Sequence, residues 1–384
     1  MRWPHFPVAL LLAAVVLCSF AVLTKRHRLQ DKAAQAEAAV RRLASRGGDP
    51  SAVLAVLRQV KPALDAHDPD KAEALLDHAL AMLKQAETAL AENGAGLPIE
   101  SRPEGRSDLY VRPEAVEISG YDGSAMEPFI SPDGRFLFFN NDNDPKVNTD
   151  LYFAERTGRL CFRYLGELPG VNSPALDAVP SMDAAGHFYF TTLRDYDRTM
   201  NSIYTGDFDG KRVSNVRPAP GNISPTTPGS VNMDTSISPD GRTLYISRAL
   251  IFPGAPAPVK SVLMVATLGN GGFRIDDDSV RIMTNINTGA LQYAPSISAD
   301  GLELYFTRAG RQRTELGALE PTVRIMVATR AAVNDPFGEP LALRALAGFV
   351  EAPSIALDKT EMFFHRKAGG KFIICRAARN IHPM

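Results

Sequence analysis

The chain has 384 residues, of which 45% are hydrophobic and 22% are charged, and its formal net charge at pH 7 is -1. This composition is typical of globular protein, and the nearly balanced charge argues against nucleic acid as a partner. Three cysteines in a chain of this length exclude a disulfide framework. The length itself predicts two or three structural units.

Residues 1–24 contain the longest apolar run of the chain, Val8 to Leu23, which is followed by the basic segment Lys25 to Arg28. The run fits a secretory signal cleaved after Ala21 and is slightly short for a membrane span. Three interpretations stay open: a cleaved signal, an anchor with the rest of the chain outside, or an anchor with the rest inside, which the basic segment favours. We expect an extracytoplasmic protein, periplasmic or secreted, that contacts the inner membrane through this segment only.

Residues 25–93 are predicted to form a helical stalk. Apolar residues between Leu29 and Leu43 alternate in spacings of four and three, which indicates a weak heptad seam. Two further helices, the last beginning after Asp68-Pro69, form a pair (ALDAHDPDKAEALLDHALAML) that resembles one tetratricopeptide unit. A single unit buries too little surface to form a groove, so we interpret it as a spacer, with a partner-docking or dimerising arm as the alternative. Residues 94–107 are rich in Gly, Pro and polar residues and predict a linker.

Residues 108–384 contain a repeat whose clearest copy is EPFISPDGRFLFF, from Glu127 to Phe139. Ser131 to Gly134 predicts a tight turn between two strands, because it combines Pro, Asp and Gly. The unbroken apolar run after the turn predicts a strand that is covered on both faces. Aligned on the turn glycine, or on Lys359 in the last copy, the repeats lie at positions 134, 186, 241, 301 and 359.

Each copy is followed by a third apolar segment, and most copies by a weaker fourth. The third segments are Asp150 to Ala154, Ser202 to Gly206, Val262 to Ala266, Arg324 to Ala328 and Phe372 to Arg376. Four strands in a period of about 50 residues indicate a β-propeller. We predict an all-β propeller of five four-stranded blades, with six as the alternative count, preceded by the N-terminal segment and the helix pair. The last copy has no fourth strand, and we expect Ala115 to Ile118 to supply it and close the ring.

Two motifs carry a family resemblance. They are the turn SPDG with a following aromatic pair or its variant SADG (Ser131 to Phe139, Ser238 to Ile246, Ser298 to Gly301) and the segment IMVATRAAVNDPFGEP (Ile325 to Pro340). Through them, residues 108–384 resemble the TolB-type, WD-repeat-like β-propeller family of exported bacterial proteins. The resemblance implies a propeller in the bacterial envelope. It selects no activity, since the family includes protein-binding scaffolds, lipoprotein modules and propeller appendages of peptidases.

Propeller topology brings the starts of the first strands and the ends of the second strands to one rim. The starts carry Glu127, Asp177, Asp234, Tyr293 and Glu351, and the ends carry Asn140, Arg194, Arg248, Arg308 and Arg366. Counting back from a two-residue turn places Glu351 opposite Arg366, and Asp234 next to the residue opposite Arg248. We interpret the rim as a ring of acid-arginine pairs, with a charged ring that faces a ligand as the alternative.

The loops that follow the second strands lie at the same rim and differ most between copies. Variable loops on a rigid scaffold are where recognition is usually placed. The candidate ligand-binding residues at this rim are Glu127, Asp177, Asp234, Glu351, Arg194, Arg198, Arg308, Arg311 and Arg313.

Motifs for metal or covalent chemistry are missing from the sequence. Asn140 to Asp150 has the acidic spacing of a calcium loop, but Lys146 and Val147 stand where an oxygen ligand and a glycine are needed. The patterns of serine hydrolases, zinc proteases and phosphate-binding loops do not occur. We therefore assign no metal, no cofactor and no catalytic residue, and we interpret His187 and His365 as packing or rim residues.

Two functions remain. The preferred one is a non-catalytic scaffold that binds a protein or an envelope polysaccharide through the variable rim. The alternative is a carbohydrate-active, glycosidase-like enzyme, with Glu127, Asp177, Asp234 and Glu351 as candidate carboxylates at the channel mouth. The two differ in one structural property: the enzyme needs at least two of these carboxylates unpaired and about 5 to 10 Å apart around an open pocket, whereas pairing with arginine favours the scaffold.

Overall fold

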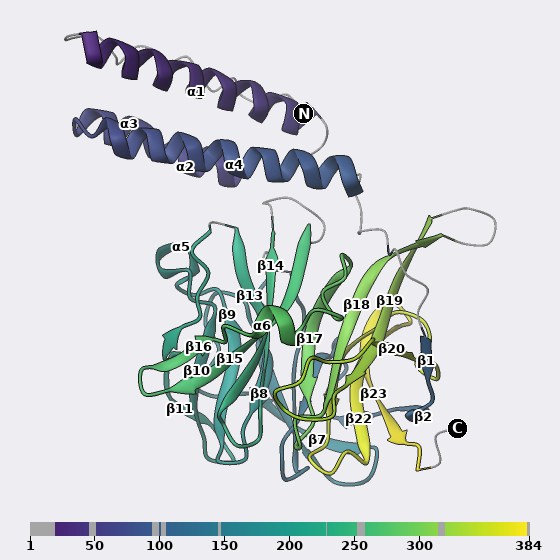
Figure 1. Cartoon of the computed structure of the whole chain (residues 1–384). Coiled ribbons are helices and arrows are strands. Elements are labelled where there is room, and N and C mark those ends of the chain that lie inside the picture. The colour runs from purple at the N-terminus through teal and green to yellow at the C-terminus, as the bar shows by residue number, and fades with distance from the viewer. Residues whose placement is uncertain are drawn as a thin grey trace. The chain divides into compact units, whose positions relative to one another are not determined.

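The computed structural model describes residues 20–45, 51–93, 100, 105–144, 147–227, 229–251, 258–313 and 319–381. The chain divides into two compact units, Met1–Gly96 with Ile251–Val259, and Leu97–Leu250 with Lys260–Met384. Figure 1 shows helices in the first unit and mostly strands in the second. Most of the predicted leader lies outside these residues, and no described helix is both long and apolar enough to cross a membrane.

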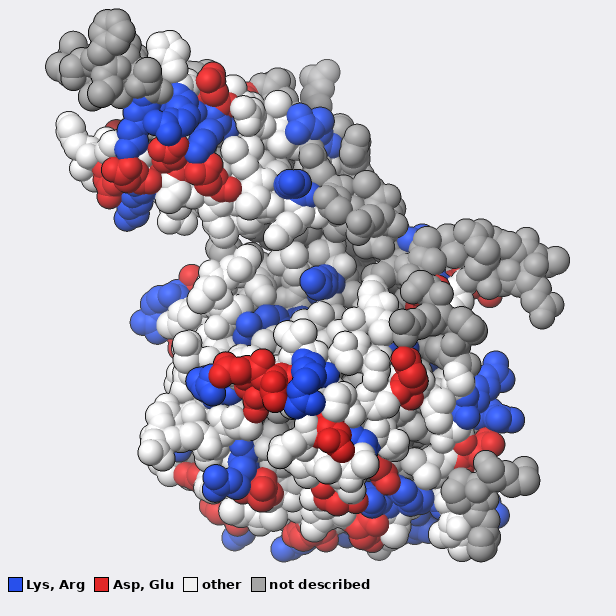
Figure 2. All heavy atoms as spheres, in the orientation of Figure 1, with Lys and Arg blue, Asp and Glu red and all other residues white. Residues whose placement is uncertain are grey.

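The first unit is helical. Its described helices are α1 (Phe20–Ser45), α2 (Ser51–Leu57), α3 (Val60–Asp65) and α4 (Pro69–Asn93). Lys32 of α1 forms ion pairs with Glu73 and Asp77 of α4 at 2.9 and 2.6 Å, and Figure 2 shows acidic and basic side chains side by side on these helices. The predicted second helix is divided into α2 and α3, because Pro62 has no backbone N–H with which to continue the helix from Arg58.

The second unit is a propeller whose described residues form five sheets. Blade 1 contains β4 (Met126–Ile130), β5 (Phe136–Asn140), β6 (Leu151–Arg156), β7 (Cys161–Glu167) and β3 (Glu117–Ser119). Blade 2 contains β8 (Asp177–Met182), β9 (His187–Thr192), β10 (Ile203–Phe208) and β11 (Val213–Pro218). Blade 3 contains β13 (Ser230–Ile237), β14 (Thr243–Leu250), β15 (Lys260–Gly269), β16 (Gly272–Ile275) and β12 (Gly221–Asn222).

Blade 4 contains β17 (Leu291–Ile297), β18 (Glu303–Arg313), β19 (Leu319–Thr329), β20 (Leu341–Leu343) and β1 (Gly105–Ser107). Blade 5 contains β21 (Val350–Ile355), β22 (Glu361–Ala368), β23 (Lys371–Arg379) and β2 (Tyr110–Ala115). Two short helices, α5 (Tyr196–Thr199) and α6 (Ser279–Ile282), lie in connections. The prediction of an all-β propeller with five blades is confirmed.

The predicted hairpin turn is stabilised by its own side chains. In blade 1 the Ser131 Oγ accepts the backbone N–H of Phe136 at 2.8 Å, and the Asp133 carboxylate accepts that of Arg135 at 3.0 Å. Gly134 has a φ of 69°, which L-residues rarely adopt. The turn motif is therefore visible in the sequence because its contacts are local.

Ring closure uses a strand near the start of the propeller. β2 pairs antiparallel with β23, with Tyr110 opposite Arg379 and Ala115 opposite Cys375. The closing strand is thus residues 110–115, whereas we had expected 115–118. Glu117–Ser119 instead form β3, which pairs in parallel with β7 of blade 1. One short segment therefore joins the last blade to the first.

Apolar side chains fill the spaces between adjacent blades. Between blades 1 and 2, the ring of Phe138 lies 5.1 Å from those of Phe188 and Phe208. Aromatic contacts of this kind bury large areas and hold neighbouring sheets in a fixed orientation. The first strands of all five blades are in this way held around the central axis.

Candidate functional site

A register shift in the first strand of blade 5 decides which residues meet at the rim. Between Glu351 and Ser354 the pairing of β21 with β22 is irregular. As a result Val350 lies opposite Arg366, and Glu351 lies opposite His365. A β-bulge adds one residue to one strand and so changes every partner beyond it. The predicted pairing of Glu351 with Arg366 assumed a regular hairpin and is wrong by one residue.

Blade 3 contains a similar irregularity. Between Asn232 and Asp234 the register of β13 against β14 shifts, so that Asn232 lies opposite Arg248 and Asp234 lies opposite Ser247. Arg248 accordingly donates from Nε to the Asn232 Oδ1 at 2.9 Å. In both blades the shift separates the acid from the arginine that the sequence had placed beside it.

Three of the arginines at the ends of the second strands each donate to a backbone carbonyl. Their guanidinium groups donate to residues that precede the first strand of the same blade: Arg194 to Val171, Arg248 to Ile223 at 2.5 Å and Arg308 to Ile286 at 3.0 Å. Only in blade 2, among the described residues, does such an arginine also bind the acid, with 2.7 Å between Arg194 and Asp177. The predicted ring of acid-arginine pairs is therefore wrong outside blade 2.

Three other rim carboxylates interact with one another through their charges. Glu127 of blade 1 and Asp234 of blade 3 are 6% and 4% exposed, and Glu351 of blade 5 is partly buried. The charge of Glu351 raises the pKa of both Glu127 and Asp234, and the charge of Glu127 also raises the pKa of Asp234. In the described part of the chain, none of the three forms an ion pair with arginine or lysine. Together with Tyr293 and His365 we call them the acid cluster.

Hydrogen bonds hold the members of the acid cluster. The Tyr293 hydroxyl donates to one oxygen of Glu351, and the Nε2 of His365 lies 3.0 Å from the other. The backbone N–H of Glu127 donates to the Nδ1 of His365 at 3.0 Å. The Asn143 side chain donates to the Oε1 of Glu127 at 2.9 Å. The acid cluster thus contains residues from four blades: blade 1, blade 3, blade 4 and blade 5.

Burial dominates the electrostatics of the cluster. Loss of hydration raises the pKa of Asp234 to about 8, and the charge of Glu127 adds to this effect. Burial likewise raises the pKa of Glu127, although His365 partly opposes it. It also raises the pKa of the Tyr293 hydroxyl, with the charge of Glu351 as the second cause. At neutral pH Asp234 is therefore mostly protonated and able to donate a proton.

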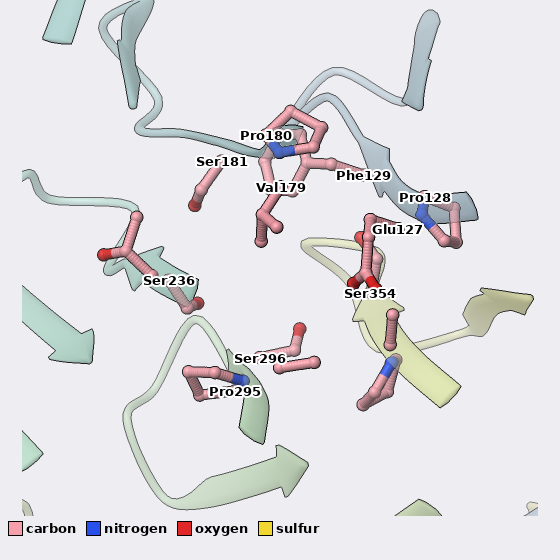
Figure 3. A pocket seen from close by; sticks show the side chains of 14 residues that line it. Glu127, Pro128, Phe129, Val179, Pro180, Ser181, Ser236, Pro295, Ser296 and Ser354 are labelled. Carbon is pink, nitrogen blue, oxygen red and sulfur yellow. The ribbon is translucent and has the colours of Figure 1, made fainter. Parts of the chain in front are cut away.

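A pocket formed by the first strands adjoins the cluster. Figure 3 shows its lining, in which Val179, Pro180 and Ser181 face Pro295 and Ser296 across the opening. Glu127 supplies the carboxylate among the described lining residues. The cavity volume of about 30 Å³ has room for about two water molecules and not for a sugar ring.

The remaining candidate residues lie outside the acid cluster. Arg198, in α5, is exposed and pairs with Asp195 at 2.8 Å. Arg311 lies in β18, where its carbonyl accepts the backbone N–H of Glu100 at 2.9 Å. The backbone of Arg313 pairs with that of Leu319. Ligand contact by these arginines, by the buried Arg308 and by Arg194 stays a prediction.

Sequence reasoning missed the roles of Tyr293, His365 and Asn143. A sequence signal for the bulges does exist. It is a recurring triplet in which a residue other than glycine is followed by Pro and then by Ser, or by Phe in blade 1. Its first residue has a positive φ in four blades: Glu127 at 48°, Val179 at 54°, Ala294 at 49° and Ala352 at 55°. Such angles are rare for side chains of this kind and mark a kink in the strand.

No protein-family model matches the chain, and no curated protein matches it. Several solved structures are similar. An endo-arabinase from Bacteroides thetaiotaomicron is 13% identical, with 70% of this chain and 98% of that chain covered and a TM-score of 0.43. A family 117 glycoside hydrolase from Zobellia galactanivorans is 10% identical, with 71% and 91% covered and a TM-score of 0.44. TolB from Acinetobacter baumannii is 15% identical, with 82% and 71% covered and a TM-score of 0.36.

These findings correct the preferred interpretation of the sequence. Several of the similar structures are glycoside hydrolases, and the prediction of a non-catalytic binding scaffold is therefore not retained as the main interpretation. The acid cluster meets one part of the requirement of the alternative, because its carboxylates have no arginine partners among the described residues. The adjoining cavity of about 30 Å³ is smaller than the open pocket that the alternative requires. The likeness to TolB is retained as a likeness of the propeller.

Proposed function

We propose that the chain is a carbohydrate-active enzyme of the glycosidase type, and that Glu127, Asp234 and Glu351 supply its carboxylates. One observation carries the proposal: Glu127 and Glu351 both contact His365, the charges of both act on Asp234, and none of the three acids has a described arginine or lysine partner. Glycoside hydrolysis needs a proton donor for the leaving oxygen and a carboxylate that acts as base or nucleophile. The envelope polysaccharide expected as a partner is then the substrate.

The environments of the acids separate their roles. Asp234 is the general acid, because burial raises its pKa to about 8 and it keeps its proton at neutral pH. Glu351 is the base or nucleophile, because each of its oxygens already accepts a hydrogen bond, from Tyr293 and from His365. Glu127 supports Asp234, since its charge raises the pKa of that acid, and it contacts the water-sized pocket.

The test is hydrolysis by the purified full chain. A panel of aryl pentosides and hexosides, together with bacterial polysaccharides, is assayed for released phenol and for new reducing ends. We expect turnover, and a fall in kcat of about 10²- to 10⁴-fold in Asp234→Asn and Glu351→Gln, as is usual when a general acid or base is lost.

Asp183→Asn is the matched control. Asp183 is 3% exposed, as deeply buried as Asp234, but it lies in the turn of blade 2 at the opposite rim, where it contacts His187 at 2.7 Å. This variant should hydrolyse glycans at close to the wild-type rate. The proposal fails if the wild-type chain hydrolyses none of the panel, or if the acid-cluster variants retain the wild-type kcat.

A further inference from the structure

His365 is a buried imidazole with polar partners on both sides. It lies on β22 and is 0% exposed, with its ring edge-on to Phe372 at 5.1 Å. Its two nitrogens face Glu127 of blade 1 and Glu351 of blade 5. The ring therefore lies where the first and the last blade of the propeller meet.

The contacts define which ring nitrogen carries hydrogen. The partner of Nδ1 is the backbone N–H of Glu127 at 3.0 Å, and a backbone N–H can only donate. Nδ1 must therefore accept, and the hydrogen of the neutral ring is on Nε2. Nε2 then donates to the Oε2 of Glu351 at 3.0 Å. This tautomer satisfies both buried contacts at once.

Both residues held by the ring need support. Glu127 has a φ of 48° and lies at the register shift of the bulged strand, where its N–H donates to His365. Glu351 is fixed at one oxygen by the Tyr293 hydroxyl from blade 4 and at the other by His365. A single imidazole thus sets the backbone of one acid and the carboxylate plane of another.

We propose that His365 is the positioning residue of the acid cluster: its Nε2–H orients Glu351, and its Nδ1 holds the bulged backbone of Glu127. The consequence for catalysis rests on the proposed function. Because the ring is wholly buried, it acts through Glu351 and Glu127. The hydrogen-bonded partner of a reacting group commonly changes rates by about 10- to 100-fold, because small displacements of that group are costly.

The first experiment requires no turnover. In full-length protein labelled with ¹⁵N at histidine, NMR reports which nitrogen of His365 is protonated, with His365→Gln used to assign the signals. We expect protonated Nε2 and unprotonated Nδ1, with the Nε2–H resonance shifted in Glu351→Gln. In the control Asp183→Asn only the His187 signals should change, because His187 is the partner of that carboxylate. The opposite tautomer, or no response to Glu351→Gln, overturns the proposal.

The second experiment separates positioning from stability. His365→Gln places an amide N–H near the Nε2 position and keeps the donor to Glu351, whereas His365→Asn places an amide oxygen near Nδ1 and keeps the acceptor for Glu127. Each variant deletes one buried hydrogen bond. We expect kcat for glycan hydrolysis to be about 10- to 100-fold lower in His365→Asn than in His365→Gln, with KM little changed.

The outcomes distinguish the two proposals. A kcat at the wild-type level in both variants, in a chain that hydrolyses glycans, overturns the role of His365 and leaves the proposed function standing. A wild-type chain that hydrolyses nothing overturns the proposed function, and the NMR experiment then decides by itself whether His365 orients Glu351.

Discussion

Asp234 lies in the interior of blade 3, 4% exposed, where water cannot compensate a negative charge. The neighbouring charge of Glu127 opposes ionisation further, while the backbone N–H of Ala294, which donates to Asp234 at 3.1 Å, favours it. Burial is the largest of these effects, so the folded chain raises the pKa to about 8. The same proton that suits Asp234 for acid catalysis makes stability depend on pH.

We expect the free energy of unfolding to fall with rising pH because of this group. In the unfolded chain the Asp234 carboxyl ionises near its ordinary pKa of 3.8, and in the folded chain near 8. Between these values the folded state binds the additional proton, and a state that binds more protons loses stability as pH rises. Asp234→Asn removes this contribution, so its stability relative to wild type should increase from pH 5 to pH 8 by at most about 1.4 kcal/mol per pH unit.

Urea denaturation at pH 5, 7 and 9 measures this effect. Ser181→Ala, which changes a buried polar group without a proton to titrate, is the control and should keep the pH dependence of wild type. If Asp234→Asn shows the same pH dependence as wild type, Asp234 is not protonated in the folded chain.

At the scale of the strands, four serines join the first strand of one blade to that of the next. We call them the serine ring: the Oγ atoms of Ser181, Ser236, Ser296 and Ser354 accept the backbone N–H groups of Ile237, Ile297, Ile355 and Ile130 at 3.1 to 3.3 Å. All four serines are buried. Blade 1 has Phe129 at the equivalent position. Phe129 has no hydroxyl, so the serine ring does not include a hydrogen bond from blade 1 to blade 2. The ring explains how an irregular strand next to the axis stays fixed.

Ser236→Ala should lower the free energy of unfolding by about 1 to 3 kcal/mol, because it leaves the buried N–H of Ile297 without its acceptor. Urea denaturation at pH 7 gives the value. Ser119→Ala, on the exposed strand β3, is the control, with an expected change within about 0.5 kcal/mol. A loss as small as that of the control would show that water or another acceptor replaces the serine.

For the whole propeller, stability depends on closing the ring. β2 precedes blade 1 in the sequence but pairs with β23 of blade 5, and so closes the ring. Tyr110 of β2 is 0% exposed, its ring lies 5.6 Å from that of Tyr305 at 82°, and its hydroxyl donates to the carbonyl of Lys359 at 2.8 Å. These contacts link three segments that are far apart in the sequence. Removing them is expected to weaken the propeller as a unit.

Tyr110→Ala should destabilise the propeller by about 3 to 5 kcal/mol, the usual cost of deleting a buried aromatic ring. Tyr110→Phe keeps the ring and loses the hydrogen bonds of the hydroxyl, among them the one to Lys359, at a cost of about 1 kcal/mol. Urea denaturation gives both values, and hydrogen exchange of the β23 amides shows whether blade 5 opens first. Unchanged protection of β23 in Tyr110→Ala would mean that closure does not depend on this residue.

The sequence alone predicted a propeller of four-stranded blades and favoured five of them over six, whereas the fifth, parallel strand in three of the sheets appears only in the structure. The turn of Ser131 to Gly134 is stabilised within a few residues, so its copies reveal the period of the propeller and the position of every hairpin. The sequence also identified the rim on which Glu127, Asp234 and Glu351 lie. It could not decide their partners, because pairing across a hairpin can be counted only where the strands are regular.

The tertiary structure decided the site. The bulges in β13 and β21 move each acid away from its expected arginine by one position, and they are held by contacts between blades, such as Ile297 to Ser236, more than 50 residues apart in sequence. The Pro-containing triplet marks the kink in four blades, but it does not say which residues then face one another, and blade 3 has Asp234-Thr235-Ser236 in its place. The protonation of Asp234 and the contacts of His365 have the same origin, since burial and proximity arise only when all five blades close around the axis.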